Sequence, residues 1–368
     1  MALSRRAFGL GLLGASVAGT GTYFAIKDRP EFQGLIGNRT ELFGFLGGEK
    51  QAFIEDADVV RALGNHGLGL DARVAGSVEM SREPALLGQN PQFLWPSSSV
   101  MVDIARASGV KVRRDQVVLN SPIVVYSWEP VVAGLTKAGL VTATMSGHYE
   151  LDLLALLSAV LAGTDWSELG VDVLYGRSRL VSTDPNRSNS GFMFAGLVLN
   201  LLSGDVADME ALDVVGEKAR DIFAGMGLKS SSSGKLFDQY LAGGYGAEPM
   251  VVGYENQLVE WILADPERWQ RIAKSTQPKP VMLYPRPTAY SAHPLITIAE
   301  AADRLLEALL SEPVQQLAWM KHGFRGPLGA VSGSADPAIA GLLPDGIGAV
   351  LPMPAANVML AFLSRLAA

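Results

Sequence analysis

Cysteine is absent from the 368-residue sequence. Its absence excludes disulfide bonds, thiolate metal sites, a thiol nucleophile and a lipidated cysteine anchor. Histidine is scarce: the four residues are His66, His148, His293 and His322, and no two stand four positions apart, the spacing at which a helix presents two imidazoles to one metal. The sequence therefore gives little support to a catalytic zinc or a histidine-based triad, and we expect no metal and no cofactor.

A basic cluster is also missing. The chain has 30 Lys and Arg against 37 Asp and Glu, a formal net charge of −7, without a Lys/Arg-rich run. Because nucleic-acid binding depends on a clustered basic face, we expect no nucleic-acid partner. What is present, 48% hydrophobic residues with 40 Gly and 20 Pro, is typical of a compact globular protein long enough for two lobes.

The N-terminus has the layout of an export signal. Residues 1–6 are short and basic, and residues 7–26 are apolar and Gly-rich. The run SRRAF at 4–8 resembles a twin-arginine signal, although Gly9 and Leu10 stand where a leucine and a basic residue are more usual. We expect residues 1–26 to direct the chain to the periplasm or another extracytoplasmic space, with membrane contact only through these residues if they stay uncleaved. A buried N-terminal helix is the alternative.

A strand, a small polar turn and a helix then follow one another three times. Residues 41–46, 68–75 and 92–95 are the expected strands. Strands alternating with helices predict an α/β fold with a mostly parallel sheet covered by helices. Ligands of such sheets lie outside the carboxyl ends of the strands. The turns therefore predict one wall of a cleft, although each turn taken singly is equally well explained as a helix cap; the candidate residues are Glu49, Ser77, Ser98 and Ser99.

The opposite wall is predicted at residues 182–191, STDPNRSNSG, between an expected strand and an expected helix. Ser188, Asn189 and Ser190 fall where the first helical amides lack an intrahelical partner, which makes an oxygen or anion site. The alternative is that Ser188 or Asn189 only caps the helix. Lys50 and Arg187 either neutralise an anion there or point to solvent.

Two segments are predicted to cross between lobes. Residues 117–126 form the longest β-like run, but Pro122 argues against a central strand. Residues 285–294 contain too many prolines for a sheet interior or a helix, which predicts an extended connector. We therefore expect one lobe from residues 27–122 and 285–368, a second from 123–284, and hinges near 121–128 and 278–294. Three aromatic residues would close the sides of the cleft unless they are core residues: Trp128, Tyr254 and Tyr290.

Taken together, these features resemble the type II periplasmic substrate-binding proteins, the molybdate- and sulfate-binding-like class. The matching motifs, in order, are GGEK at 47–50, F-x-x-D at 53–56, AGS at 75–77, SP-x-V-x-Y-S-W at 121–128 and TDP-x-x-SNSG at 183–191. The resemblance covers the chain from about residue 40 onward, with extra helical material around 140–175 and 200–248. It implies a two-lobed fold with two hinge crossings. It also implies a non-enzymatic protein that captures a small polar or anionic ligand, including an oxyanion, and delivers it to the permease of a membrane ABC-type transporter.

Two rival functions remain open. Ser232-Ser233-Gly234-Lys235 matches the S-x-x-K of penicillin-recognising enzymes, but S-D-N, K-T-G and the hydrolase motif G-x-S-x-G are absent from the sequence. G-x-G-x-x-G does not follow the first strand, which disfavours a dinucleotide fold. A serine-type hydrolase and an anchored periplasmic scaffold without a small ligand are therefore the alternatives.

Overall fold

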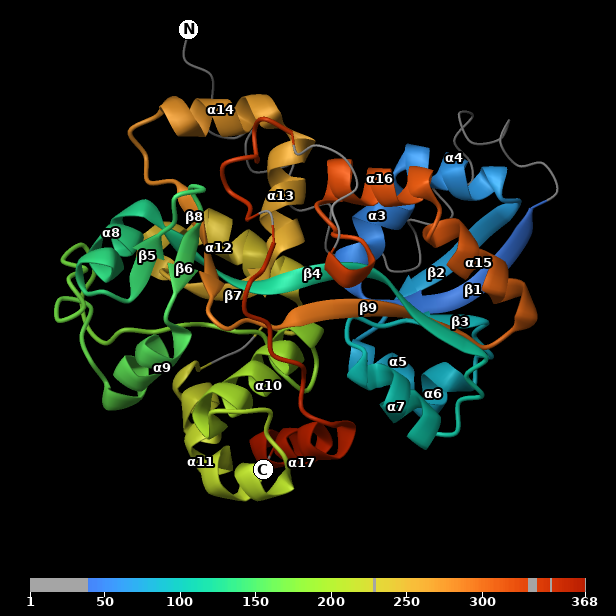
Figure 1. The fold of residues 1–368 in the computed structure, drawn as a ribbon, viewed down its shortest axis with the longest axis horizontal. Coiled ribbons are helices and arrows are strands. Elements are labelled where there is room, and N and C mark those ends of the chain that lie inside the picture. Colours follow the sequence, from blue (N-terminus) through green and yellow to red (C-terminus); the bar gives the residue numbers. More distant parts are fainter. Residues whose placement is uncertain (1–38, 228–229, 330–335, 345, 368) are drawn as a thin grey trace, which may run out of the picture.

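The computed structural model describes residues 39–227, 230–329, 336–344 and 346–367. The expected export signal at residues 1–26 lies outside these ranges. The described chain folds around one sheet of nine strands with helices on both faces (Figure 1). No helix within the described ranges is both long and apolar enough to span a membrane.

The first part of the sheet follows the predicted strand–helix alternation. Its parallel strands are β1 (Thr40–Leu46), β2 (Leu68–Val74) and β3 (Phe93–Trp95). Buried apolar side chains on both faces of β1 hold it between two layers of helices. These layers contain α3 (Gln51–Glu55), α4 (Ala57–Asn65), α5 (Ser77–Arg82), α6 (Pro84–Leu87), α7 (Val100–Ala107), α15 (Asp303–Leu309) and α16 (Glu312–His322).

The second part is built around β4 (Arg114–Trp128), with β7 (Val251–Tyr254) and β8 (Pro280–Pro285) antiparallel to it. β6 (Tyr149–Leu151) pairs parallel with β8, and β5 (Val141–Ala143) closes the edge. Here the sheet is mixed rather than mostly parallel, because β4 and β8 run in opposite directions. The helices are α8 (Glu129–Lys137), α9 (Leu153–Ala162), α10 (Asn189–Ser203), α11 (Met209–Gly225), α12 (Ser233–Ala247), α13 (Glu255–Ala264) and α14 (Pro266–Lys274).

Pro122 does not interrupt β4, so the inference from this proline was wrong. β4 is continuous over 15 residues, and Pro122 lies opposite Tyr290. Backbone N–H groups of an antiparallel strand point alternately to its two neighbours. The amide of Ile123 donates to Ala289 on the β9 side of β4, so the nitrogen of Pro122 faces the opposite side of this strand. On that side Pro122 lies between the bridge from Asn120 to Arg325 and the start of the pairing with β7. No ladder hydrogen bond is lost at that position.

The proline-rich connector is also shorter than predicted. Residues 290–294 belong to β9 (Tyr290–Thr297), which lies inside the sheet between β3 and β4. Pro294 faces Val117 beside a register shift in β4. Such an irregularity removes the need for a donor at the proline, which explains its place inside the sheet.

α10 is the centre of the largest hydrophobic core. It is apolar on all sides and almost completely buried, as expected for a helix covered from every direction. α17 (Ala356–Ala367) packs against α11 and α7, with Met359 and Phe362 in the same core. The division of the chain into lobes stays a prediction; the C-terminal helix packs mainly against α11, a helix of the second part.

Candidate functional site

A cleft of about 280 Å³ opens between the two parts of the structure. One wall consists of residues 47–49 after β1, residues 74–77 at the end of β2 and the start of α5, and Glu79. The other wall consists of residues 187–189 at the start of α10 and residues 231–233 at the start of α12. The volume lies just below the usual range for ligand sites, roughly 300–1,000 Å³, and so suits a small solute.

Below the first wall, Lys50 is completely buried in a polar cluster. Its ammonium donates to Glu49 Oε1 at 2.5 Å, Ser97 Oγ at 2.8 Å and His293 Nδ1 at 3.0 Å. An ammonium has three donors, so all of them are used within the protein. Lys50 thus neither points to solvent nor has a donor free for an anion in this arrangement. The hydroxyl of Ser97 also donates to Glu49 Oε1.

The cluster has defined protonation states. Burial acts to raise the pKa of Glu49, but the charge of Lys50 and the contact with His293 together outweigh it and hold this pKa well below its usual range, so the carboxyl is ionised. Burial lowers the pKa of Lys50, and Glu49 opposes this. Burial, together with the charge of Lys50, lowers the pKa of His293 to about 4, which leaves the imidazole neutral at pH 7. Since Nδ1 accepts from Lys50, Nε2 carries the proton and donates to Ser291 Oγ at 3.2 Å.

The start of α10 contributes the second wall. Ser188 is the N-cap residue, but no side chain caps the helix. The Ser188 and Ser190 hydroxyls are 3.2 Å apart, and Ser190 is 2.7 Å from Thr183 Oγ1. Neither Ser188 nor Asn189 therefore caps the helix with its side chain: the Ser188 hydroxyl contacts Ser190, and Asn189 donates away from the helix.

Asn189 joins the two walls. Its Nδ2 donates to the carbonyl of Ser97 at 2.7 Å and to the hydroxyl of Tyr254 at 3.1 Å. Its Oδ1 is buried and has no hydrogen-bond partner in the described part of the chain. Arg187 beside it is exposed at the cleft.

The structure brings four predicted site residues to the cleft surface: Glu49, Ser77, Ser188 and Asn189. Ser190 and Tyr254 lie directly behind them and are buried. The Ser77 hydroxyl accepts from the amide of Ser97 at 3.0 Å, which fixes the first wall.

Four other predicted residues do not line the cleft. Ser98 is buried with an unpartnered hydroxyl, and Ser99 is exposed at the start of α7. Trp128 packs against Tyr240 in the core and donates to the carbonyl of Glu248. Tyr290 is half-buried on the side of Arg325 and Glu255. Trp128 is therefore a core residue.

Sequence reasoning missed Ser97, Ser291 and His293. Ser291 and His293 alternate along β9 with a period of two, so they share one face of that strand. That signal was hidden because the segment was interpreted as a connector. Ser97 belongs to the predicted turn after β3, but Ser98 and Ser99 of the same turn were chosen as the candidate site residues.

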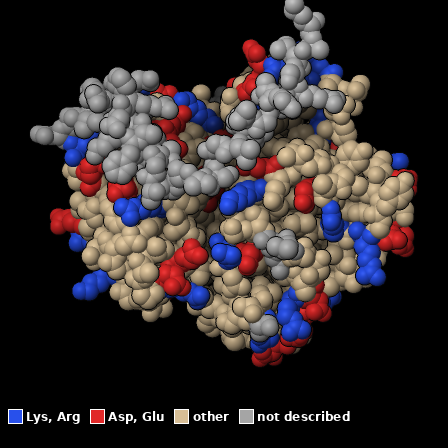
Figure 2. All heavy atoms as spheres, turned by 180° about the vertical axis from the view of Figure 1, so that it is seen from behind, with Lys and Arg blue, Asp and Glu red and all other residues tan. Residues whose placement is uncertain are grey.

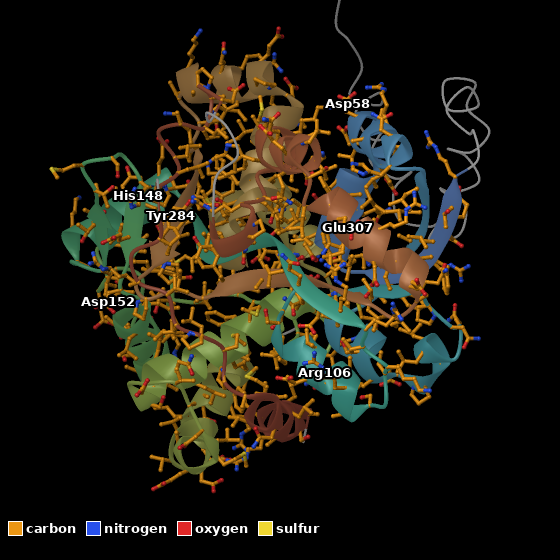
Figure 3. All side chains as sticks on the ribbon, turned by 45° about the vertical axis from the view of Figure 1, so that its right-hand side comes forward. Asp58, Arg106, His148, Asp152, Tyr284 and Glu307 are labelled. Carbon is orange, nitrogen blue, oxygen red and sulfur yellow. The ribbon has the colours of Figure 1, made fainter. Side chains whose placement is uncertain are left out.

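A second buried ion pair lies away from the cleft. Arg325 donates to both carboxylate oxygens of Glu255 at 2.6 and 2.9 Å, and the Tyr284 hydroxyl donates to Glu255 at 2.6 Å. His148 packs edge-on against Tyr284 (Figure 3), beside a cavity of about 80 Å³. This cavity is too small for an organic solute, and we interpret the ion pair as a structural tie between β8, α13 and residue 325.

Lys and Arg are interspersed with Asp and Glu on the face in Figure 2. No group of three His, Asp or Glu in the described ranges is placed to hold a metal ion.

Comparison with known proteins shows the fold. No protein-family model matches the chain, and no curated protein matches it. Among solved structures, it is similar to a periplasmic thiamin-binding protein at 13% identity, with a TM-score of 0.59 and coverage of 89% of this chain and 95% of that one. It is also similar to the apo ferric ion-binding protein A of Pasteurella haemolytica (11% identity, TM-score 0.55, coverage 90% and 96%). A third is the periplasmic binding protein AfuA of Actinobacillus pleuropneumoniae with fructose-6-phosphate (12%, 0.53, 88% and 97%). The chain has the two-lobed α/β fold of periplasmic binding proteins.

Proposed function

We propose that this chain is an exported solute-binding protein that holds a small polar or anionic solute in its cleft and delivers it to a membrane ABC-type transporter. The observation that carries the proposal is the cleft itself, which is lined from both parts of the structure. It combines the carboxyl ends of β1 and β2 with the start of α10. These are the two places where an α/β fold presents groups to a ligand.

An oxyanion on the solute fits the α10 side of the cleft. The first amides of this 15-residue helix have no side-chain cap, and the Ser188 hydroxyl and Arg187 stand beside them. Amide donors and the helix dipole both favour negative charge at such a position.

The serine-hydrolase alternative is disfavoured at both candidate serines. Ser232, the first residue of the S-x-x-K match, accepts from the amide of Lys235 and is the N-cap of α12. Ser97 does contact a lysine ammonium, but it is completely buried. A nucleophile needs access to its substrate, so we propose binding rather than catalysis at this site.

The test is native mass spectrometry of the protein purified from its extracytoplasmic compartment. We expect a co-purified small molecule that is depleted in the Ser188→Ala protein, because Ser188 lines the cleft and a hydrogen bond to a charged ligand is worth roughly 1.5–3 kcal/mol. The loss of this bond weakens binding by about one to two orders of magnitude. A ligand-free wild-type protein that also fails to bind any solute in a thermal-shift screen would favour a scaffold without a small ligand.

A further inference from the structure

The carboxylate of Glu49 divides its two oxygens between the protein and the cleft. Oε1 accepts from Lys50 and Ser97. Oε2 has no hydrogen bond to any described residue, and Glu49 lines the cleft with a side chain that is 6% exposed. The ionised group therefore offers one unfilled, charged acceptor to a ligand.

A second unfilled acceptor belongs to Asn189. Its Oδ1 is buried without a partner, although buried polar atoms are normally hydrogen-bonded. Asn189 and Glu49 are neighbours through Ser97, since Asn189 donates to the Ser97 carbonyl and Glu49 accepts from the Ser97 hydroxyl. A donor placed at the base of the cleft would meet acceptors from both walls.

Lys50, the cation of this cluster, cannot bind a ligand without giving up a hydrogen bond inside the protein. Lys50 is completely buried and uses its three donors on Glu49, Ser97 and His293. An anion that took the place of Glu49 would leave a carboxylate partly buried without its cation, which is unfavourable. The base of the cleft therefore presents negative charge, while Arg187 and the start of α10 present positive potential at the other side.

We propose that Glu49 and Asn189 form a subsite for a protonated amine, so that the solute is a small zwitterion with its oxyanion at the start of α10. This inference rests on the proposed function and names the class of its ligand. The amine donates to Glu49 Oε2 and, with a small rotation of the amide, to Asn189 Oδ1.

Matched pairs of probes test the subsite. Calorimetry and thermal shift compare phosphoethanolamine with ethyl phosphate, and 4-aminobutyrate with butyrate, which differ only in the amine. The proteins are wild type, Glu49→Gln, and Glu49→Gln combined with Lys50→Met, which removes both charges in case the single variant does not fold. Glu83→Gln is the control, because Glu83 is exposed and does not line the cleft.

We expect at least one amine-bearing probe to bind wild type and the Glu83 variant about tenfold or more tightly than its partner, as for a hydrogen bond between charged groups. The preference should vanish in the folded Glu49 variants. If the anions without an amine bind wild type as tightly as the zwitterions, the subsite is wrong and the proposed function stands. A preference that persists without Glu49 also overturns the inference, as does a failure of all four probes to bind. In that last case a co-purified solute still decides the proposed function.

Discussion

At the scale of single residues, the sign of the charge that the cleft presents to a ligand depends on which member of an ion pair is buried more deeply. Lys50 is completely enclosed, whereas Glu49 keeps one edge at the cleft. The two residues are adjacent in the sequence and carry opposite charges, so composition alone does not predict which charge faces the cleft. The backbone turn after β1 directs the lysine inward, to Ser97 and His293, and leaves the carboxylate beside the solute.

The lowered pKa of His293 predicts a loss of stability in mild acid. The unfolded chain takes up a proton on this residue near pH 6.5, whereas the folded chain does so only near pH 4. The contribution of neutral His293 to the free energy of unfolding is present above pH 6.5 and is lost as the pH falls toward 4, because the unfolded state then binds more protons. Between pH 7 and pH 5 we expect this residue to reduce the free energy of unfolding by roughly 2 kcal/mol, measured by urea titration.

His293→Gln supplies the control for this pH dependence. Glutamine keeps a polar side chain but does not titrate, so the part of the slope that comes from residue 293 should disappear, whatever the variant's stability at pH 7. Equal slopes for wild type and variant between pH 7 and pH 5 would show that His293 is not buried in its neutral form.

The predicted site residues that line the cleft share a local signal. Glu49, Ser77, Ser188 and Asn189 each stand in a turn between an apolar strand or segment and a helix, which the sequence shows within a few positions. His293 carries no such signal, since its partner Lys50 is 243 positions away. Contacts of that range depend on the order of strands in the sheet, and the sequence does not contain that order in a local form.

At the scale of elements, the alternation of strands and helices was predictable, but the places of two prolines were not. A proline in a strand is unfavourable only if its missing N–H faces a neighbour, and this depends on pairing. At Pro122 the pairing on the side of its nitrogen is interrupted. Beside Pro294 the register with β4 shifts. The sequence rule was applied without this knowledge, so β4 and β9 were interpreted as broken.

The start of α10 requires glycine at position 191. A Cβ there would lie 2.8 Å from the nitrogen of Pro185, 2.9 Å from the carbonyl carbon of Asp184 and even nearer the Thr183 oxygen. All three are backbone atoms, which cannot move without displacing the turn before the helix. We expect Gly191→Ala to destabilise the protein by about 1–3 kcal/mol and to weaken solute binding, measured by urea unfolding and by calorimetry.

Gly225→Ala is the matched change at another helical glycine. Gly225 is exposed at the end of α11, and a Cβ there would have no neighbour within 4 Å. Alanine favours a helix over glycine by up to about 1 kcal/mol, so this variant should be as stable as wild type or slightly more so. If both variants behave alike, the close approach of residues 183–185 to α10 does not constrain the site.

At the scale of the whole molecule, the two walls of the cleft belong to parts that share β4 and the β8–β9 segment. We predict that these connections act as hinges and that the walls approach when a solute binds, since few connecting segments can absorb a rotation of two packed bodies.

The lack of native cysteine allows a direct test, because two introduced cysteines will be the only sites for spin labels. Arg73→Cys and Lys235→Cys are exposed and lie beside opposite walls. Electron–electron distance measurements should show a shorter separation once a binding solute is added. A control pair within the first part, Arg73→Cys with Glu83→Cys, should keep its distance. Unchanged distances for both pairs at saturation would mean that the cleft captures its solute without closing.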